Sequence, residues 1–175
     1  MTRGPRSESS TYADIVIVGA GHAGAQLVFS LAQNNYAGSV MLIGDEPHQP
    51  YERPPLSKAY LKGDLDRAGL ALREPAYWGA ASAVLRLGQP VVAVDPQTRS
   101  ATLGNGEIVG YGDLVWAAGG RARRLPLPGA DLDGVVYLRD LADADDLVER
   151  LSPDRKVCII GGGYGPDGAG RPVRR

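Results

Sequence analysis

The sequence predicts an α/β fold in three layers: a parallel sheet covered by helices, with an antiparallel β-meander as one of its crossovers. Two observations predict it. Apolar runs at 14–18 and 39–43 flank a segment with helical periodicity, which is the strand–helix–strand unit of a parallel sheet. Short alternating runs between 91 and 109 then indicate hairpin-connected strands. We expect this fold to be incomplete at the C-terminal end.

The first apolar run stops at a glycine-rich turn, with Gly19, Gly21 and Gly24 in Gly-x-Gly-x-x-Gly spacing. A strand before this pattern and a helix after it are typical of a Rossmann-like dinucleotide site. Gly19 permits the tight turn, Gly21 lets the backbone approach a pyrophosphate, and Gly24 lets the helix pack on the strand. The helix N-terminus supplies N–H groups and a partial positive charge for phosphates.

The second apolar run ends in Asp45, about 20 residues after the last glycine of the turn. At that spacing, an acidic side chain accepts hydrogen bonds from a ribose hydroxyl. The alternative is an ordinary solvated acid at a strand end.

The remaining segments predict a series of short elements. Four prolines between 47 and 55 exclude a continuous helix or central strand there. Asn105 and Gly106 suit a two-residue hairpin turn, and Asp140 suits the cap of an amphipathic helix. We expect a short helix near 74–83, strands at 91–94, 100–103 and 107–109, buried strands at 113–118 and 156–160, and a helix over 140–151.

Composition excludes several classes of function. With 19 basic and 20 acidic residues the net charge is −1, so no basic surface for nucleic acid is implied. No apolar run approaches the roughly 18 residues of a membrane span. Residues 1–12 are polar and unlike a signal peptide, which predicts a cytoplasmic protein. The single cysteine, Cys158, is expected to be buried, and the two histidines, His22 and His48, suggest no metal site.

Four stretches together resemble the flavoprotein reductases that pass electrons from a nicotinamide to ferredoxin or rubredoxin, a group within the pyridine nucleotide-disulfide oxidoreductases. The Pro-Pro-Leu-Ser-Lys element is the most specific of the four. The likeness runs from about residue 13 to 164 and rests on 17–24, 51–58, 117–123 and 137–139.

The resemblance implies that the bound nucleotide is FAD. Ala23 and its flanking glycines would contact the pyrophosphate, and Asp45 would hold the adenosine ribose. Lys58 would lie beside the isoalloxazine ring, where a cation stabilises the reduced flavin. The other implied cofactor residues are Arg53 at the flavin end, Val91 with its backbone at the adenine, and Arg123 and Arg139 near the phosphates or flavin edge. Lys58, Arg123 and Arg139 also read as ordinary surface charges.

By the same resemblance, hydride passes from NAD(P)H to FAD and single electrons pass to an iron–sulfur ferredoxin or rubredoxin, with no catalytic side chain, nucleic acid or membrane involved. The sequence departs from the family at Ala118, where Thr is usual, and at Ala122, where Pro is usual. A second glycine turn at 161–163 leads into a tail rich in Gly, Pro and Arg instead of an apolar helix.

We therefore expect a disordered leader at 1–12, the N-terminal part of an FAD-binding domain at 13–152, the start of a truncated NAD(P)-binding domain at 153–163, and a disordered tail at 164–175. The alternative function is a truncated or frameshifted, non-catalytic fragment of such a reductase. In either case we expect weak FAD retention and negligible NAD(P)H oxidation by 1–175 alone. A third interpretation, an NAD-binding dehydrogenase, explains the first glycine turn but not the Pro-Pro-Leu-Ser-Lys element.

Overall fold

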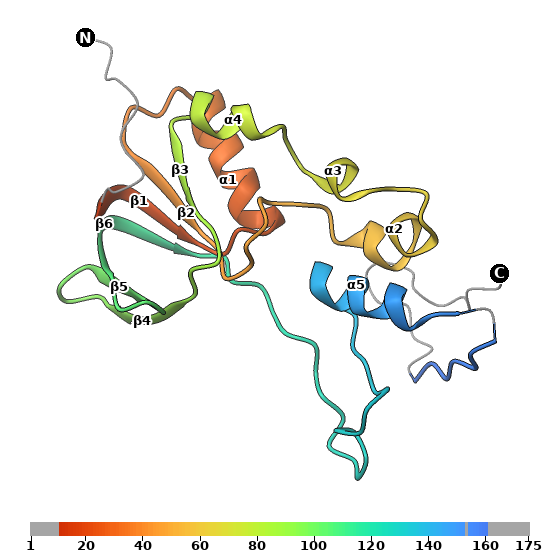
Figure 1. The fold of residues 1–175 in the computed structure, drawn as a ribbon. Helices are drawn as coiled ribbons and strands as arrows, with labels where there is room; N and C mark the ends of the chain where they lie inside the picture. The colour runs from red at the N-terminus through yellow and green to blue at the C-terminus, as the bar shows by residue number, and fades with distance from the viewer. Residues whose placement is uncertain (1–10, 153, 161–175) are drawn as a thin grey trace. The chain divides into compact units, whose positions relative to one another are not determined.

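The computed structural model describes residues 11–152 and 154–160 (Figure 1). These residues divide into two compact units. The first unit holds the chain up to Tyr51 together with 71–120, and the second holds 52–70 together with the chain from Arg121 onward.

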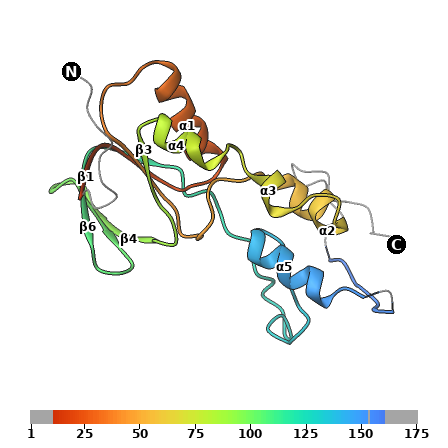
Figure 2. The same ribbon diagram turned by 45° about the horizontal axis from the view of Figure 1, so that its top comes forward.

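All six strands of the described residues lie in the first unit, in one mixed sheet of order β3-β2-β1-β6-β5-β4. The two helices of this unit, α1 and α4, lie on the same side of the sheet (Figure 2). Its elements are β1 (Tyr12–Val18), α1 (His22–Gln33), β2 (Val40–Ile43), α4 (Pro75–Ala80), β3 (Ala83–Arg86), β4 (Val91–Asp95), β5 (Ser100–Leu103) and β6 (Ile108–Trp116).

The parallel half of the sheet forms because β1 and β2 are almost wholly apolar, as strands covered on both faces must be. Val18 pairs with Ile43 across β1 and β2, and Ile43 pairs with Arg86 across β2 and β3. One face packs on the helices through a buried cluster of Ile17, Ala25, Val28, Phe29, Val40, Leu42, Trp78 and Ala83.

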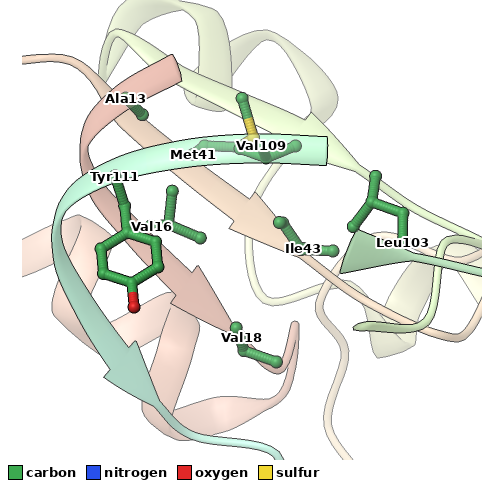
Figure 3. Close-up of a cluster of buried hydrophobic side chains, with 8 residues drawn as sticks. All are labelled: Ala13, Val16, Val18, Met41, Ile43, Leu103, Val109 and Tyr111. Atoms are coloured by element: carbon green, nitrogen blue, oxygen red, sulfur yellow. The ribbon is translucent and has the colours of Figure 1, made fainter. Parts of the chain in front are cut away.

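The meander covers the opposite face. Side chains of β5 and β6 meet those of β1 and β2 in a second cluster, whose buried members are Ala13, Val16, Val18, Met41, Ile43, Leu103, Val109 and Tyr111 (Figure 3). Helices, parallel strands and meander therefore form the three expected layers, and the predicted α/β fold is confirmed.

Strand β6 differs from the prediction of two separate strands at 107–109 and 113–118. It is one strand that pairs antiparallel with β5 through Ile108 to Gly110 and parallel with β1 from Gly110 to Trp116. A Cβ at Gly112 would lie 2.6 Å from the Asp14 carbonyl oxygen, so glycine permits the close approach of β6 to β1. The prediction that 113–118 is buried is wrong, since Trp116 is 62% exposed.

The β5–β6 connection is also longer than predicted. The N–H of Leu103 donates to Glu107 O (2.8 Å) and the N–H of Gly106 donates to Leu103 O (2.9 Å). Gly106 has a φ of +88°, so a glycine in the left-handed region closes a loop longer than two residues.

The second unit carries four short elements: η1 (Pro54–Ser57), α2 (Ala59–Lys62), α3 (Arg67–Leu70) and α5 (Leu141–Arg150). Helix α5 begins at the predicted cap. Asp140 accepts a hydrogen bond from the N–H of Asp143 (3.0 Å), and the Asp143 carboxylate accepts one from the N–H of Asp140 (3.2 Å). The amphipathic helix predicted at 140–151 is confirmed.

The prediction of a buried strand at 156–160 is wrong. These residues are irregular and exposed, and Cys158 is exposed with them. A strand needs a neighbour to satisfy its N–H and C=O groups, and the residues that the structure describes offer none here.

The glycine turn at 161–163, the tail and most of the expected leader lie outside the described residues. Strand β1 begins at Tyr12, two residues earlier than expected. No helix in the described part of the chain is long and apolar enough to span a membrane.

Candidate nucleotide-binding site

The glycine turn lies at the carboxyl edge of the parallel strands. The N–H of Gly19 donates to Ile43 O (2.8 Å), which fixes the turn to the end of β2. Gly19 has a φ of +114°, and a Cβ there would overlap the carbonyl of Ala117 just after β6. The turn is therefore held between the two neighbours of β1, at the edge where open α/β sheets bind ligands.

Gly24 lets α1 pack against this turn. A Cβ at Gly24 would overlap the carbonyl oxygen of Gly19 and would lie 2.9 Å from a side-chain methyl of Leu42. Both contacts are within the chain. Gly19 and Gly24 are thus required by the fold itself, whether or not a ligand binds.

Gly21 is different, because nothing in the fold requires a glycine at this position. Its φ of −94° suits any residue, and a Cβ there would meet no heavy atom within 4 Å. Gly21 is the N-cap of α1 and supplies no side chain to cap it. The position leaves open space directly at the N-terminus of the helix.

The first turn of α1 favours an anion in that space. The helix has 12 residues, and its first turn carries no acidic side chain. Its first N–H groups have no partner within the helix, and the helix dipole places a partial positive charge there. Ala23 is exposed in this turn, as is His22, the first helical residue. The small side chain of Ala23 leaves the N–H groups accessible, so the turn can bind a phosphate.

Asp45 and Val91 are placed near the same edge by the loops that follow β2 and β3. The N–H of Gly44 donates to Arg86 O (2.9 Å), and the N–H of Gln89 donates to Gly44 O (2.8 Å). These bonds continue the β2–β3 pairing beyond the strands. Asp45 is exposed immediately after Gly44, and Val91 begins β4 two residues after Gln89. The first unit thus brings together six predicted residues: Gly19, Gly21, Ala23, Gly24, Asp45 and Val91.

An ion pair beside this edge was not predicted. Arg86 at the end of β3 pairs with Glu107, which immediately precedes β6, and the two side chains are 16% and 27% exposed. The pair links β3 to the meander. The sequence hints at this pair only through Arg86, a charged residue at the end of an apolar strand. Nothing in the sequence marks Glu107, 21 residues later, as its partner.

The remaining four predicted residues lie in the second unit. Arg53 Nη1 donates to the carbonyl oxygen of Arg139 (3.0 Å), so these two residues are brought together from the two chain segments of the unit. Lys58 is exposed between η1 and α2. Its N–H donates to Pro55 O (2.9 Å), and its carbonyl accepts from the N–H of Lys62 (3.1 Å). Arg123 is exposed in an irregular stretch, and no contact with the other three is seen within the described ranges.

A family model described as pyridine nucleotide-disulphide oxidoreductase matches residues 13–165. The chain belongs to this family. Although the family is named for a disulphide, this sequence holds one cysteine, so it has no cysteine pair of its own for dithiol chemistry.

Within the family the chain is similar to ferredoxin reductases, as the sequence motifs predicted. It is 49% identical over 156 residues to a ferredoxin–NAD(P)⁺ reductase from Sphingomonas sp., an alignment that covers 89% of this chain and 38% of the relative. The ferredoxin reductase for the CYP199A2 system of Rhodopseudomonas palustris superposes with a TM-score of 0.74 at 43% identity, covering 78% of this chain and 34% of the other.

A covalent putidaredoxin reductase–putidaredoxin complex contains a chain that superposes with a TM-score of 0.74 at 37% identity, covering 81% of this chain and 35% of the other. The chain thus spans little more than a third of the length of these relatives.

Proposed function

We propose that this chain is the FAD-binding, N-terminal portion of an NAD(P)H-dependent reductase of the ferredoxin or rubredoxin type. The observation that carries the proposal is the open space at Gly21, on the uncapped N-terminus of a 12-residue helix. A fold that needs no glycine there, and yet has one, fits a ligand whose pyrophosphate approaches the backbone closely. The comparisons favour FAD among the dinucleotides.

In this proposal the first unit binds the ADP side of the cofactor. The N–H groups of the first turn of α1, at Ala23 and its neighbours, donate to the pyrophosphate. The Asp45 carboxylate accepts hydrogen bonds from the adenosine ribose, and the Val91 backbone meets the adenine. Asp45 is exposed, and the hydrogen bond it accepts from the N–H of Glu46 (3.1 Å) leaves its carboxylate further acceptor capacity.

The second unit supplies the cations in this proposal. Lys58 would lie at the isoalloxazine ring, where its ammonium group would stabilise negative charge on the reduced ring. Arg53, Arg139 and Arg123 are placed at the phosphates or the flavin edge. Support comes from the hydrogen bond that joins Arg53 to Arg139 and from the exposed position of Lys58 at a proline-rigid junction.

When bound, the flavin supplies the change from two-electron to one-electron transfer. For the whole protein we propose that hydride comes from NAD(P)H and that single electrons leave for a small iron–sulfur protein, a ferredoxin or rubredoxin. The cytoplasm is the proposed location, because the nicotinamide donor is a cytoplasmic metabolite.

Equilibrium binding of FAD, ADP and NAD⁺ to the purified chain tests the proposal. We expect FAD to bind at least about tenfold more tightly than NAD⁺, measured by flavin fluorescence and by calorimetry. Gly21→Val is expected to abolish binding of all three ligands without changing the circular dichroism spectrum. Gly79→Val is the matched control, since a Cβ at Gly79 also meets nothing within 4 Å but lies in α4.

Two outcomes would contradict the proposal. Binding of NAD⁺ as tightly as FAD would favour a nicotinamide-dependent dehydrogenase site instead. Unchanged FAD affinity in Gly21→Val would show that the glycine turn does not bind the pyrophosphate.

A further inference from the structure

Helix α5 is joined to the Lys58 segment by polar contacts at two places. Arg53, just before η1, donates to the carbonyl of Arg139, just before α5. One turn into the helix, the Asp145 carboxylate accepts from the Tyr60 hydroxyl (Oδ1, 2.5 Å) and from Arg67 Nη2 (Oδ2, 2.6 Å). All of these residues belong to the second unit.

Asp145 therefore contacts the helices on both sides of the connection between α2 and α3, which follows Lys58. Tyr60 lies in α2, two residues after Lys58, and Arg67 begins α3. The partners are 85 and 78 residues from Asp145 in the sequence. Helix α5 also packs against η1 and α2, and the elements of this contact carry the buried side chains Leu56, Leu61, Leu141 and Ala144.

The Tyr60 bond is partly buried, whereas the Arg67 bond is exposed. A short hydrogen bond to a charged oxygen is among the strong ones in proteins, whereas the Arg67 side chain is 60% exposed and its ion pair is screened by solvent. Burial raises the pKa of Tyr60, and the bond to Asp145 raises it further. The hydroxyl therefore stays protonated and remains a donor at neutral pH.

We propose that Asp145 is a positioning residue for the cofactor: through Tyr60 it fixes the backbone at Lys58, and so holds the Lys58 ammonium where the flavin is to bind. The short helix α2 has four residues and is too short to be stable alone. The polar contact with α5 adds to the apolar packing of η1 and α2 on the same helix, and together they order the segment. This inference rests on the proposed role of Lys58.

Comparing FAD with ADP isolates the effect of Asp145 on binding of the flavin end, because ADP lacks the part of the cofactor that Lys58 would contact. In Asp145→Ala we expect FAD affinity to fall about tenfold and ADP affinity to stay within about twofold. Asp145→Asn keeps an acceptor for Tyr60 and is expected to retain most of the FAD affinity. Asp146→Ala is the matched control, since Asp146 bonds Arg150 of its own helix (2.7 Å).

A double-mutant cycle distinguishes positioning from general stabilisation. If Asp145 acts through Lys58, then Asp145→Ala should change FAD affinity by less than about twofold when Lys58 is already alanine. An additive loss in the double variant would overturn the proposal, and so would an equal loss of FAD affinity in the Asp146→Ala control.

Tryptic cleavage separates failure of this inference from failure of the proposed function. If the wild-type chain binds no FAD, the proposed function fails. Cleavage after Lys58 and Lys62 then tests separately whether Asp145 orders the Lys58 segment. Asp145→Ala should speed cleavage at these two sites relative to cleavage after Arg99 in the first unit. An unchanged ratio would overturn the assignment of Asp145.

Discussion

Gly19 and Gly24 are held by contacts inside the chain, and Gly21 is open to whatever approaches the helix. The three glycines of this pattern therefore meet two different structural requirements. The first two let β1, the turn and α1 come together, and the third leaves the N-terminus of α1 uncovered.

Gly24→Ala is expected to destabilise the fold before it affects any ligand. Its methyl group would overlap the Gly19 carbonyl, and strain from overpacking of this kind typically costs about 1–3 kcal/mol. Urea unfolding followed by circular dichroism measures the loss. Gly79→Ala, at an open position in α4, should change the free energy of unfolding by less than about 1 kcal/mol; equal effects of the two variants would contradict the interpretation.

At the residue scale, position in the fold is predictable from the sequence where the signal is local. The glycine turn lies between the end of β1 and the start of α1, and Asp45 lies just after the end of β2. The roles of these residues toward a ligand stay predictions. The pairs Arg86–Glu107 and Tyr60–Asp145 join residues 21 and 85 positions apart. No periodicity or turn chemistry encodes such pairs, since they exist only once the chain has folded.

At the scale of elements, the β4–β5 hairpin depends on an ionised side chain. Asp95 Oδ1 accepts from the N–H groups of Gln97 (2.8 Å) and Thr98 (3.3 Å). The Thr98 side chain, followed by these N–H groups, lowers the pKa of Asp95 from its ordinary value. The folded state thus prefers the carboxylate, and the turn is more stable when Asp95 is charged.

The stability that Asp95 contributes should depend on pH. Because its folded pKa lies below the unfolded value of about 3.9, the contribution is present above about pH 4 and is lost as the pH falls through the folded pKa. Asp95→Ala should therefore lower the melting temperature at neutral pH, and the difference from wild type should shrink on acidification. The exposed Asp131→Ala serves as control. A difference independent of pH would contradict this reading of the turn.

Elements were predictable where each carries its own pattern, as α1 and α5 do. Strand β6 was not predictable as one strand, because glycines at 110 and 112 are typical of a break between two strands. In the sheet these glycines lie within one strand that pairs with both β5 and β1. The run at 156–160 has a strand-like composition, but composition does not provide a neighbouring strand.

In the molecule as a whole, burial is uneven between the two units. Both large apolar clusters lie in the first unit. Among the described residues of the second unit, the buried apolar side chains are Leu56, Leu61, Leu70, Leu141 and Ala144. Since local opening is easiest where few apolar contacts are broken, the second unit should open more often than the first.

Native-state hydrogen exchange checks this expectation. Amides of β1 and β2 should exchange at least about tenfold more slowly than those of α2 and α5. Binding of FAD, if the cofactor contacts Lys58, should slow amide exchange in α2 and reduce the difference in exchange rate between α2 and the strands β1 and β2. Uniform protection across both units in the free chain would contradict the uneven distribution of stability.

The position of β1 also governs the order in which the sheet assembles. Among the six strands of this sheet it is synthesised first, yet it lies in the interior of the sheet, between β2 and β6. Its β2 edge is paired as soon as residue 43 is available, whereas its other edge waits for residues 110–116. Closing a connection of about 100 residues is slow compared with local pairing. During synthesis, one side of the strand that leads into the glycine turn therefore stays unpaired until most of the first unit has been made.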